Sequence, residues 1–239
     1  MIHHHGSFYI EPGLGDFIWH LSLVDSYGKS CVLGGPAWYK GYGLENLVAS
    51  ITPNVMNVKF DGLGLKWWWD YMYGGHDWKS CACTYMANRL GIRPQVVLSE
   101  EAVSRLGRYP RRDRLIVHPV PGGACKEWNG WGDLDLSGYD AICVGADKER
   151  QVLDLPRFSG DYLSLARFLV ASRGVVCVSS SVYSLARLLG VPTVLICMDE
   201  ISYSCYSGFG INLMRPTSSE VQFAIERMME EGRTWTNGR

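Results

Sequence analysis

The first residues whose types could do chemistry lie in EPGLGDFIWHLSL, residues 11–23, where a Gly-Leu-Gly turn ends in an acid. Asp16 could belong to a nucleotide-binding turn, act as a catalytic base, or cap the helix that the apolar run predicts over about residues 16–27. The turn lacks the third glycine of the dinucleotide fingerprint, so a nicotinamide-dependent oxidoreductase would rest on this motif alone. Taken alone, the segment leaves these roles open.

A second set of polar residues and glycines follows expected strands in the second half of the chain. It is spread over the segments VHPVPGGACKEW, VGADKE and VVCVSSSVYSLARLLG. Its members are Gly122, Lys126, Gly145, Glu149, Ser179, Ser180 and Ser181.

The elements that must position these residues alternate between strand and helix. Strands are expected near residues 7–10, 30–35, 55–60, 114–120, 139–145, 174–180 and 192–198, and helices near 16–27, 43–50, 80–92, 162–172, 181–190 and 217–232. Thr217 and Glu220 form a capping box for the last helix, and Gly232 is its expected stop. This order predicts an α/β fold with mostly parallel sheets covered on both faces.

Two segments stand out by composition. The run RLGRYPRRDR holds five arginines, among them Arg111 and Arg112, and is either a solvated interdomain linker or a site for an anionic acceptor or a phosphate. Trp67 and Trp68 belong to an aromatic cluster that either fills a core or stacks on a sugar or base. We therefore expect an N-terminal domain over 1–109, a C-terminal domain over 110–215, and a helix and tail over 216–239 that could pack back on the N-terminal domain.

Composition limits the classes of function. The chain has 239 residues, 47% hydrophobic and 20% charged, and a net charge of -1, which argues against coating of nucleic acid by bulk charge. Eight scattered cysteines predict free thiols in a reducing cytoplasm, and no run predicts a secretory signal or a membrane span. The opening MIHHHGS resembles a shortened tag, so its histidines are left out of any metal site. No other residues have metal-ligand spacing, and no metal or cofactor is expected.

The motifs, in this order, resemble those of the ADP-heptose:lipopolysaccharide heptosyltransferase family. That family has a Gly-Asp turn after its first strand, an HPG...K-x-W segment, a strand ending in G-x-x-x-E, and a D-[ST]-G-x-x-H-L-A-x-x-x-G-x-P segment. The resemblance covers most of the chain. It implies the GT-B fold, in which two Rossmann-like domains face each other across a cleft.

The resemblance also implies roles for individual residues. Asp16 matches the catalytic base, Lys126 the lysine that holds the donor phosphates, and Glu149 the acid that binds the nucleoside ribose. A carboxylate near a helix start stays ionised at neutral pH, and a fixed ammonium stabilises the negative charge of a leaving diphosphate. The helix that begins near Ser181 offers backbone N–H groups to the same anion. The implied activity is metal-independent inverting transfer of a sugar, heptose-like and ADP-linked, to a saccharide or other hydroxyl acceptor.

Two departures affect the donor side. Ser179 and Ser184 stand where the family has its aspartate and histidine, which leaves the donor sugar open. Ser180, Ser181, Gly122 and Gly145 complete the expected donor site. For the acceptor side we expect contacts from Gly15, His20, Trp67, Trp68, Arg111 and Arg112, although His20 is also explained as a helix histidine with its hydrogen bonds satisfied.

Two alternatives to this activity stay open. The acceptor could be a hydroxylated base in DNA, with arginines on phosphates and tryptophans on bases. The chain could also be a nucleotide-sugar binding module without turnover, since two family residues are replaced.

Overall fold

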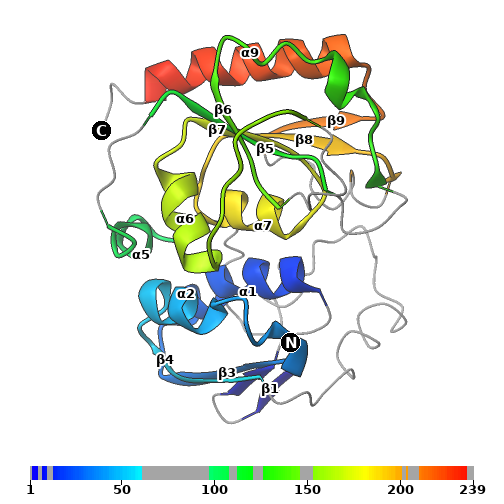
Figure 1. Ribbon diagram of the computed structural model, residues 1–239. Helices are drawn as coiled ribbons and strands as arrows, with labels where there is room; N and C mark the ends of the chain where they lie inside the picture. The colour runs from blue at the N-terminus through cyan, green and yellow to red at the C-terminus, as the bar shows by residue number, and fades with distance from the viewer. Residues whose placement is uncertain are drawn as a thin grey trace. The chain divides into compact units, whose positions relative to one another are not determined.

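The computed structural model describes residues 2–4, 7–9, 13–60, 97–107, 112–120, 126–145, 153–200, 203 and 210–235. Contacts within the chain divide it into two compact units (Figure 1). The N-terminal unit comprises Met1–Arg108 and Gly160–Ala166, and the C-terminal unit comprises Tyr109–Ser159 and Arg167–Arg239. The division between them along the chain falls inside the arginine-rich segment.

The N-terminal unit contains a sheet with the strand order β1-β2-β3-β4. Its strands are β1 (Ile2–His4), β2 (Ser7–Tyr9), β3 (Cys31–Gly35) and β4 (Val55–Phe60). The pairs β2-β3 and β3-β4 are parallel, as expected, whereas β1 pairs with β2 antiparallel. The opening residues, which resemble a tag, therefore take part in the sheet.

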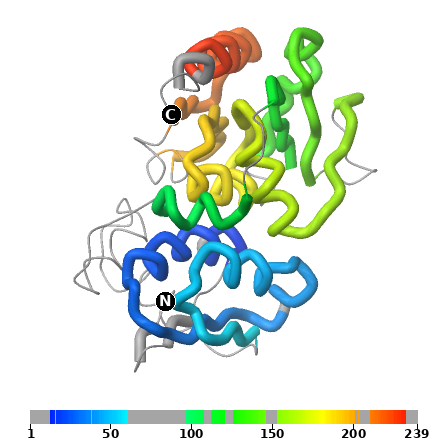
Figure 2. The backbone as a smooth tube through the Cα atoms, turned by 90° about the vertical axis from the view of Figure 1, so that its left-hand side faces the viewer, coloured from blue at the N-terminus to red at the C-terminus, as the bar shows by residue number. Residues whose placement is uncertain are grey.

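The helices of the N-terminal unit are α1 (Leu14–Tyr27), the short η1 (Ala37–Tyr39), α2 (Leu44–Ile51) and α5 (Glu100–Ser104). Figure 1 shows α1 and α2 on the same side of the sheet. Their apolar residues, including Phe17, Leu21, Leu47 and Ile51, are fully buried. The short helix α5 contacts α2, and Figure 2 shows it next to the other helices of this unit.

The C-terminal unit contains a wholly parallel sheet with the strand order β6-β5-β7-β8-β9. Its strands are β5 (Arg114–His118), β6 (Asp140–Cys143), β7 (Gly174–Val178), β8 (Thr193–Cys197) and β9 (Ile211–Met214). Its helices are η3 (Gly130–Asp133), α7 (Ser181–Leu188) and α9 (Ser218–Trp235), and α6 (Tyr162–Val170) precedes β7. Every residue of β7 and β8 is buried, because α7 and α9 cover opposite faces of the sheet (Figure 1).

The last helix packs on the C-terminal sheet and corrects one expectation. Val221, Ala224, Ile225 and Met228 follow helical spacing, and all four are buried in one core with strand residues of the C-terminal sheet. Helix α9 therefore packs on this sheet. It also continues past Gly232 to Trp235, so that glycine does not stop it.

Two other expectations are confirmed, the capping box and, for four of the cysteines, the free thiols. Thr217 and Glu220 form the capping box, in which the Thr217 N–H donates to Glu220 Oε2 at 2.8 Å and the Glu220 N–H donates to Thr217 Oγ1 at 3.4 Å. Four of the cysteines, Cys31, Cys143, Cys177 and Cys197, are buried free thiols. None of the described helices combines the length and apolar character needed to cross a bilayer.

Candidate functional site

The topology of the C-terminal sheet places a candidate site at the carboxyl ends of its strands. The neighbouring strands β5 and β7 lead away in opposite directions, β5 to β6 on one side and β7 to β8 on the other. Ligands of open parallel sheets bind outside the carboxyl ends of strands where the order reverses in this way. The residues that follow His118 and Val178, the ends of β5 and β7, are therefore the first to inspect.

Lys126 and Ser179 come together at these strand ends. The Lys126 Nζ donates to Ser179 Oγ at 3.3 Å, although 53 positions separate the two residues. Ser179 is only 2% exposed, and Lys126 is half-buried. Among the residues that the structure describes, no carboxylate lies within 4.0 Å of the Lys126 ammonium. The carboxyl ends of these strands thus present an ammonium that forms no ion pair with a described acid.

Helix α7 begins beside this pair. Ser180 is its N-cap, and the Ser180 Oγ accepts a hydrogen bond from the Tyr183 N–H at 3.3 Å. Ser181 is the first helical residue, and the Ser184 hydroxyl donates to the Ser180 carbonyl at 3.3 Å. Because the first N–H groups of a helix lack intrahelical acceptors and carry partial positive charge, the start of α7 adds to the attraction for an anion.

The ends of β5 and β6 are joined through His118. This imidazole is 6% exposed, and its Nδ1 lies 2.6 Å from the Val144 carbonyl oxygen. Burial lowers the pKa of His118 to about 4, although hydrogen bonds to the backbone of Val144 and Val120 act in the opposite direction. The neutral ring therefore donates from Nδ1 to Val144 and fixes the residue before Gly145.

Two features of the structure favour glycine at position 145. Its φ of +73° lies in the left-handed region, and a Cβ there would lie 2.8 Å from His118 Cε1. We expect Gly145→Ala to lower the free energy of unfolding by about 3 kcal/mol through backbone strain and overpacking. Gly28→Ala is the matched control, because Gly28 has a φ of +64° with nothing within 4 Å, and should cost only about 1 kcal/mol. Urea unfolding of both variants measures the difference, and equal losses would show that the His118 contact is unimportant.

The low pKa of His118 predicts a pH dependence of stability. Above pH 6.5 the imidazole is neutral in the folded and unfolded chain, whereas between pH 6.5 and about 4 only the unfolded chain binds the proton. The free energy of unfolding therefore decreases as the pH is lowered through this window, by about 3 kcal/mol from this group. In His118→Asn a neutral amide donor replaces the ring. Urea unfolding at pH 7 and pH 4 should show a smaller loss in this variant, and an equal loss would contradict the assignment.

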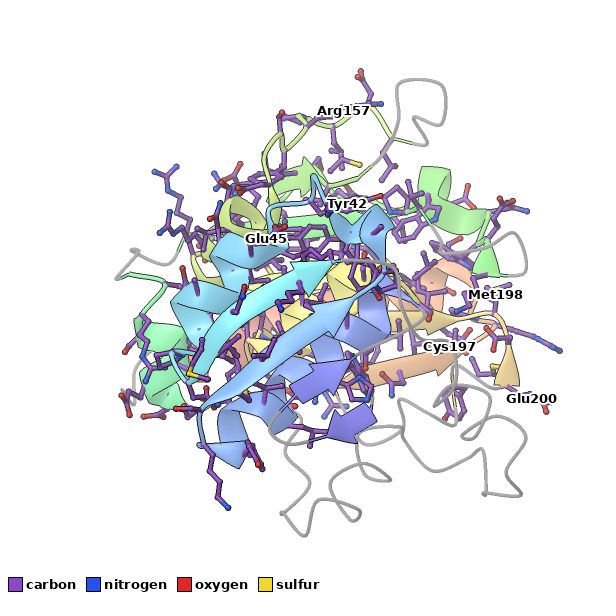
Figure 3. All side chains as sticks on the ribbon, turned by 90° about the horizontal axis from the view of Figure 1, so that it is seen from below. Tyr42, Glu45, Arg157, Cys197, Met198 and Glu200 are labelled. Atoms are coloured by element: carbon purple, nitrogen blue, oxygen red, sulfur yellow. The ribbon has the colours of Figure 1, made fainter. Side chains whose placement is uncertain are left out.

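Lys126 also acts at the end of the next strand. Burial, the largest cause, and the Asp199 carboxylate raise the pKa of the Cys197 thiol to about 12, whereas the Lys126 ammonium acts in the opposite direction. The ammonium thus lies near the ends of both β7 and β8. Figure 3 labels Cys197, Met198 and Glu200 at the carboxyl end of β8. No sequence motif indicated that Cys197 borders the site.

The position of Asp16 in the structure differs from one expectation. Helix α1 begins at Leu14 with Gly13 as its N-cap, so Asp16 is the third helical residue and does not cap the helix. The Gly13 carbonyl also accepts a hydrogen bond from the Tyr39 hydroxyl at 2.9 Å. The Tyr39 ring also packs edge-to-face on Phe17 at 5.1 Å. These contacts fix the first turn of α1, which contains Asp16.

The other expected site residues fall into two groups. Gly15 is the second residue of α1, and His20 is fully buried, which favours its alternative as a helix packing residue. Arg112 precedes β5 and donates its N–H to the Ala171 carbonyl at 2.8 Å. It therefore lies at the amino ends of the strands, whereas Lys126 lies at their carboxyl ends. Outside the described residues lie Gly122, Glu149, Trp67, Trp68 and Arg111.

Two arginines of the basic segment make internal contacts. Arg105 pairs with Glu101 at 2.7 Å, and Arg114 pairs with Asp140 at 2.8 Å and stacks on Phe168. These contacts engage part of the charge on which a phosphate-binding role would depend. Within the described ranges, no group of three or more His, Cys, Asp or Glu side chains could hold a metal ion.

The chain is similar to known proteins in structure but not in sequence. No protein-family model matches the sequence, and no curated protein sequence matches it. The structure is similar to E. coli heptosyltransferase WaaC with ADP-2-deoxy-2-fluoro heptose, at a TM-score of 0.64 and 12% identity over 92% of this chain and 98% of WaaC. It is also similar to the dodecameric iron-containing heptosyltransferase TibC in complex with ADP-D-beta-D-heptose, at a TM-score of 0.67 and 14% identity over 95% of this chain and 76% of TibC.

A glycosyl transferase family 9 protein from Veillonella parvula gives a TM-score of 0.57, with 12% identity over 94% of this chain and 97% of that protein. Identities this low show a shared fold and nothing finer. The resemblance read from the sequence motifs is confirmed at that level: the chain has the α/β fold, with parallel sheets, of the GT-B heptosyltransferases.

Proposed function

We propose that the chain is a glycosyltransferase that moves a sugar from a nucleotide-diphosphate donor to an acceptor hydroxyl. The observation that carries the proposal is the Lys126–Ser179 contact of 3.3 Å beside the start of α7, at the reversal point of a parallel sheet. An ammonium without a described acidic partner is suited to a diphosphate. The likeness to heptosyltransferase structures described with ADP and ADP-heptose supports an ADP-linked, heptose-like donor.

On the donor side, Lys126 and the first turn of α7 would hold the diphosphate. Ser179, Ser180 and Ser181 would contribute hydroxyl and N–H groups, and Glu149 would accept hydrogen bonds from the ribose. Gly145, and Gly122 by analogy, would let the backbone approach the nucleotide closely. These assignments place the nucleoside toward β6 and the sugar toward β8.

The reaction would be an inverting displacement. The acceptor oxygen attacks the anomeric carbon, the bond from that carbon to the diphosphate oxygen breaks, and its electron pair leaves on the diphosphate. Asp16 accepts the proton of the acceptor hydroxyl. Lys126 stabilises the charge that grows on the leaving group, so it would contribute more to the transition state than to the ground state.

The cleft between two Rossmann-like domains would bring Asp16 and the donor together. The acceptor, a saccharide or another hydroxyl compound, would contact Gly15, Trp67, Trp68, Arg111 or Arg112. Four buried free thiols agree with the cytoplasm as its compartment.

A thermal-shift screen of ADP-, UDP- and GDP-linked sugars tests this proposal. A donor at about 100 times its Kd adds about 2.7 kcal/mol of stability, which raises the Tm of a chain of this size by about 5–10 °C. We expect the ADP-linked sugar to give the largest shift, and sugar transfer to acceptor saccharides to follow. Absence of any shift with all donors would contradict the proposal.

A binding module without turnover is a second candidate. It is favoured by Ser184, which stands at the position of the family histidine and uses its hydroxyl to bond the Ser180 carbonyl inside its own helix. This candidate predicts donor binding with neither transfer nor donor hydrolysis. Chromatography of donor and products after incubation with acceptors separates it from the enzyme.

A further inference from the structure

Arg215 has an unusual backbone conformation. Among the described residues it alone has a positive φ without being glycine, at +46°. It directly follows β9 and directly precedes Pro216, and a proline restricts the residue before it further. For a long side chain the left-handed region costs about 1–3 kcal/mol and persists only where surrounding contacts hold it. Such positions are concentrated at functional sites.

Three hydrogen bonds hold the turn at Arg215. Its N–H donates to the Cys197 carbonyl at 2.8 Å, and its Nε donates to the Met198 carbonyl at 3.4 Å. The next carbonyl, of Pro216, accepts from the Trp128 Nε1 at 2.9 Å. The turn is therefore bound both to the end of β8 and to the segment that carries Lys126.

Trp128, which connects the Arg215 turn to the segment that carries Lys126, is packed in the core. Its ring is 7% exposed and packs edge-to-face on Trp131, with ring centres 5.0 Å apart. Both rings belong to the core beneath α9. Since Trp128 lies two residues after Lys126, one packed ring helps to fix the lysine segment and the Arg215 turn relative to each other.

Arg215 and Lys126 bring two positive charges to the end of β8. The Lys126 ammonium acts on the thiol of Cys197, and the Arg215 Nε donates to the carbonyl of Met198, the following residue. Figure 3 labels Cys197 and Met198. Arg215 is exposed, and no carboxylate in the described part of the chain lies within 4.0 Å of its guanidinium. The Asp199 carboxylate also acts on the Cys197 thiol, but it forms no ion pair with either cation, so both keep N–H donors for an anion.

We propose that Arg215 is a second cationic contact for the donor diphosphate and binds the phosphate farther from the nucleoside. This inference rests on the proposed function, which places the nucleoside toward β6 and so the outer phosphate toward β8 and β9. Adjacent strands lie about 4.8 Å apart, so the turn after β9 is one strand from the end of β8 and two from Ser179, the residue that Lys126 contacts. A guanidinium can donate two parallel hydrogen bonds to one phosphate, which complements the single point charge of the ammonium.

Isothermal titration of the full chain with ADP and with AMP tests the assignment. Arg215→Gly removes the guanidinium and accepts the left-handed backbone without strain, so its Tm should be unchanged or higher. We expect it to bind ADP about 10- to 100-fold more weakly, with AMP affinity within about twofold of the original. Arg227→Gln is the matched control, since Arg227 is an exposed arginine of α9 paired with Glu231 at 2.7 Å, and should change neither affinity.

The possible results separate this inference from the proposed function. If ADP binding is lost in Lys126→Ala but unchanged in Arg215→Gly, the role of Arg215 is wrong and the donor site stands. Equal losses of ADP and AMP affinity in Arg215→Gly would place its contact on the nucleoside and also overturn the inference. If the unsubstituted chain binds no ADP, the proposed function fails and the inference with it. Arg215→Asn, which also tolerates the left-handed region, replaces the glycine variant if that one does not fold.

Discussion

Replacing Lys126 with alanine is expected to weaken ADP binding by about 100-fold while leaving the fold intact. The ammonium has one hydrogen bond, to Ser179 Oγ, and no acidic partner among the described residues, so the protein itself loses little without it. The diphosphate, in contrast, would lose the charge nearest to it. Titration calorimetry with ADP measures the affinity, and the Tm reports the fold.

Two comparisons sharpen this experiment. Lys126→Arg keeps the charge at a different geometry, so it should retain more affinity than the alanine variant. Lys59→Ala removes an exposed lysine from β4 and should not change binding. Raising the salt concentration should weaken ADP binding by the unsubstituted chain and have less effect on Lys126→Ala. ADP affinity that is equal in Lys126→Ala and the unsubstituted chain would remove the basis of the donor site.

The central strands of the C-terminal sheet could be predicted because strands buried on both faces have continuous apolar sequences. GVVCV and TVLIC are continuous apolar runs, and every residue in them is buried. Strand β9, with the sequence INLM, was not predicted, because it is short, lies at the edge of the sheet, and is only half-buried. Strand β1 was missed for another reason. Its histidines resemble a tag, and its pairing with β2 cannot be predicted from composition.

The ends of helices were less predictable than their existence. Helix α1 begins at Leu14, next to a hydrogen bond from Tyr39 to Gly13 that joins residues 26 positions apart. Local sequence favoured Asp16 as the cap because acids are common there, but the helix begins two residues earlier, at Leu14. In α9 the packing of Met228 and Met229 against the sheet supports the helix close to Gly232.

The site shows a similar limit. Lys126 and Ser179 lie 53 positions apart, so only the order of the motifs, through a family resemblance, connected them before the structure did. Arg215 had no such motif, and its left-handed backbone is imposed by the end of β8 and by Trp128, neither of which is a neighbour in sequence. Long-range contacts of this kind have no local signature.

Replacing Asp16 with asparagine is expected to lower sugar transfer by about 1,000-fold while ADP affinity stays within about twofold. The amide keeps the size of the side chain but cannot accept the proton of the acceptor hydroxyl. The first turn of α1 is held by Tyr39 and Phe17, so the backbone at residue 16 should not move. Product formation with donor and acceptor at saturating concentration measures the effect on kcat.

Asp25→Asn provides the control, because Asp25 lies in the last part of the same helix and accepts a hydrogen bond from the Ser99 N–H at 3.3 Å. It should leave transfer unchanged. A loss of transfer together with ADP affinity in Asp16→Asn would show a binding or folding role, whereas full transfer would mean that another group takes the proton. Loss of transfer alone requires a carboxylate that acts after the donor is bound, which a binding module without turnover does not have.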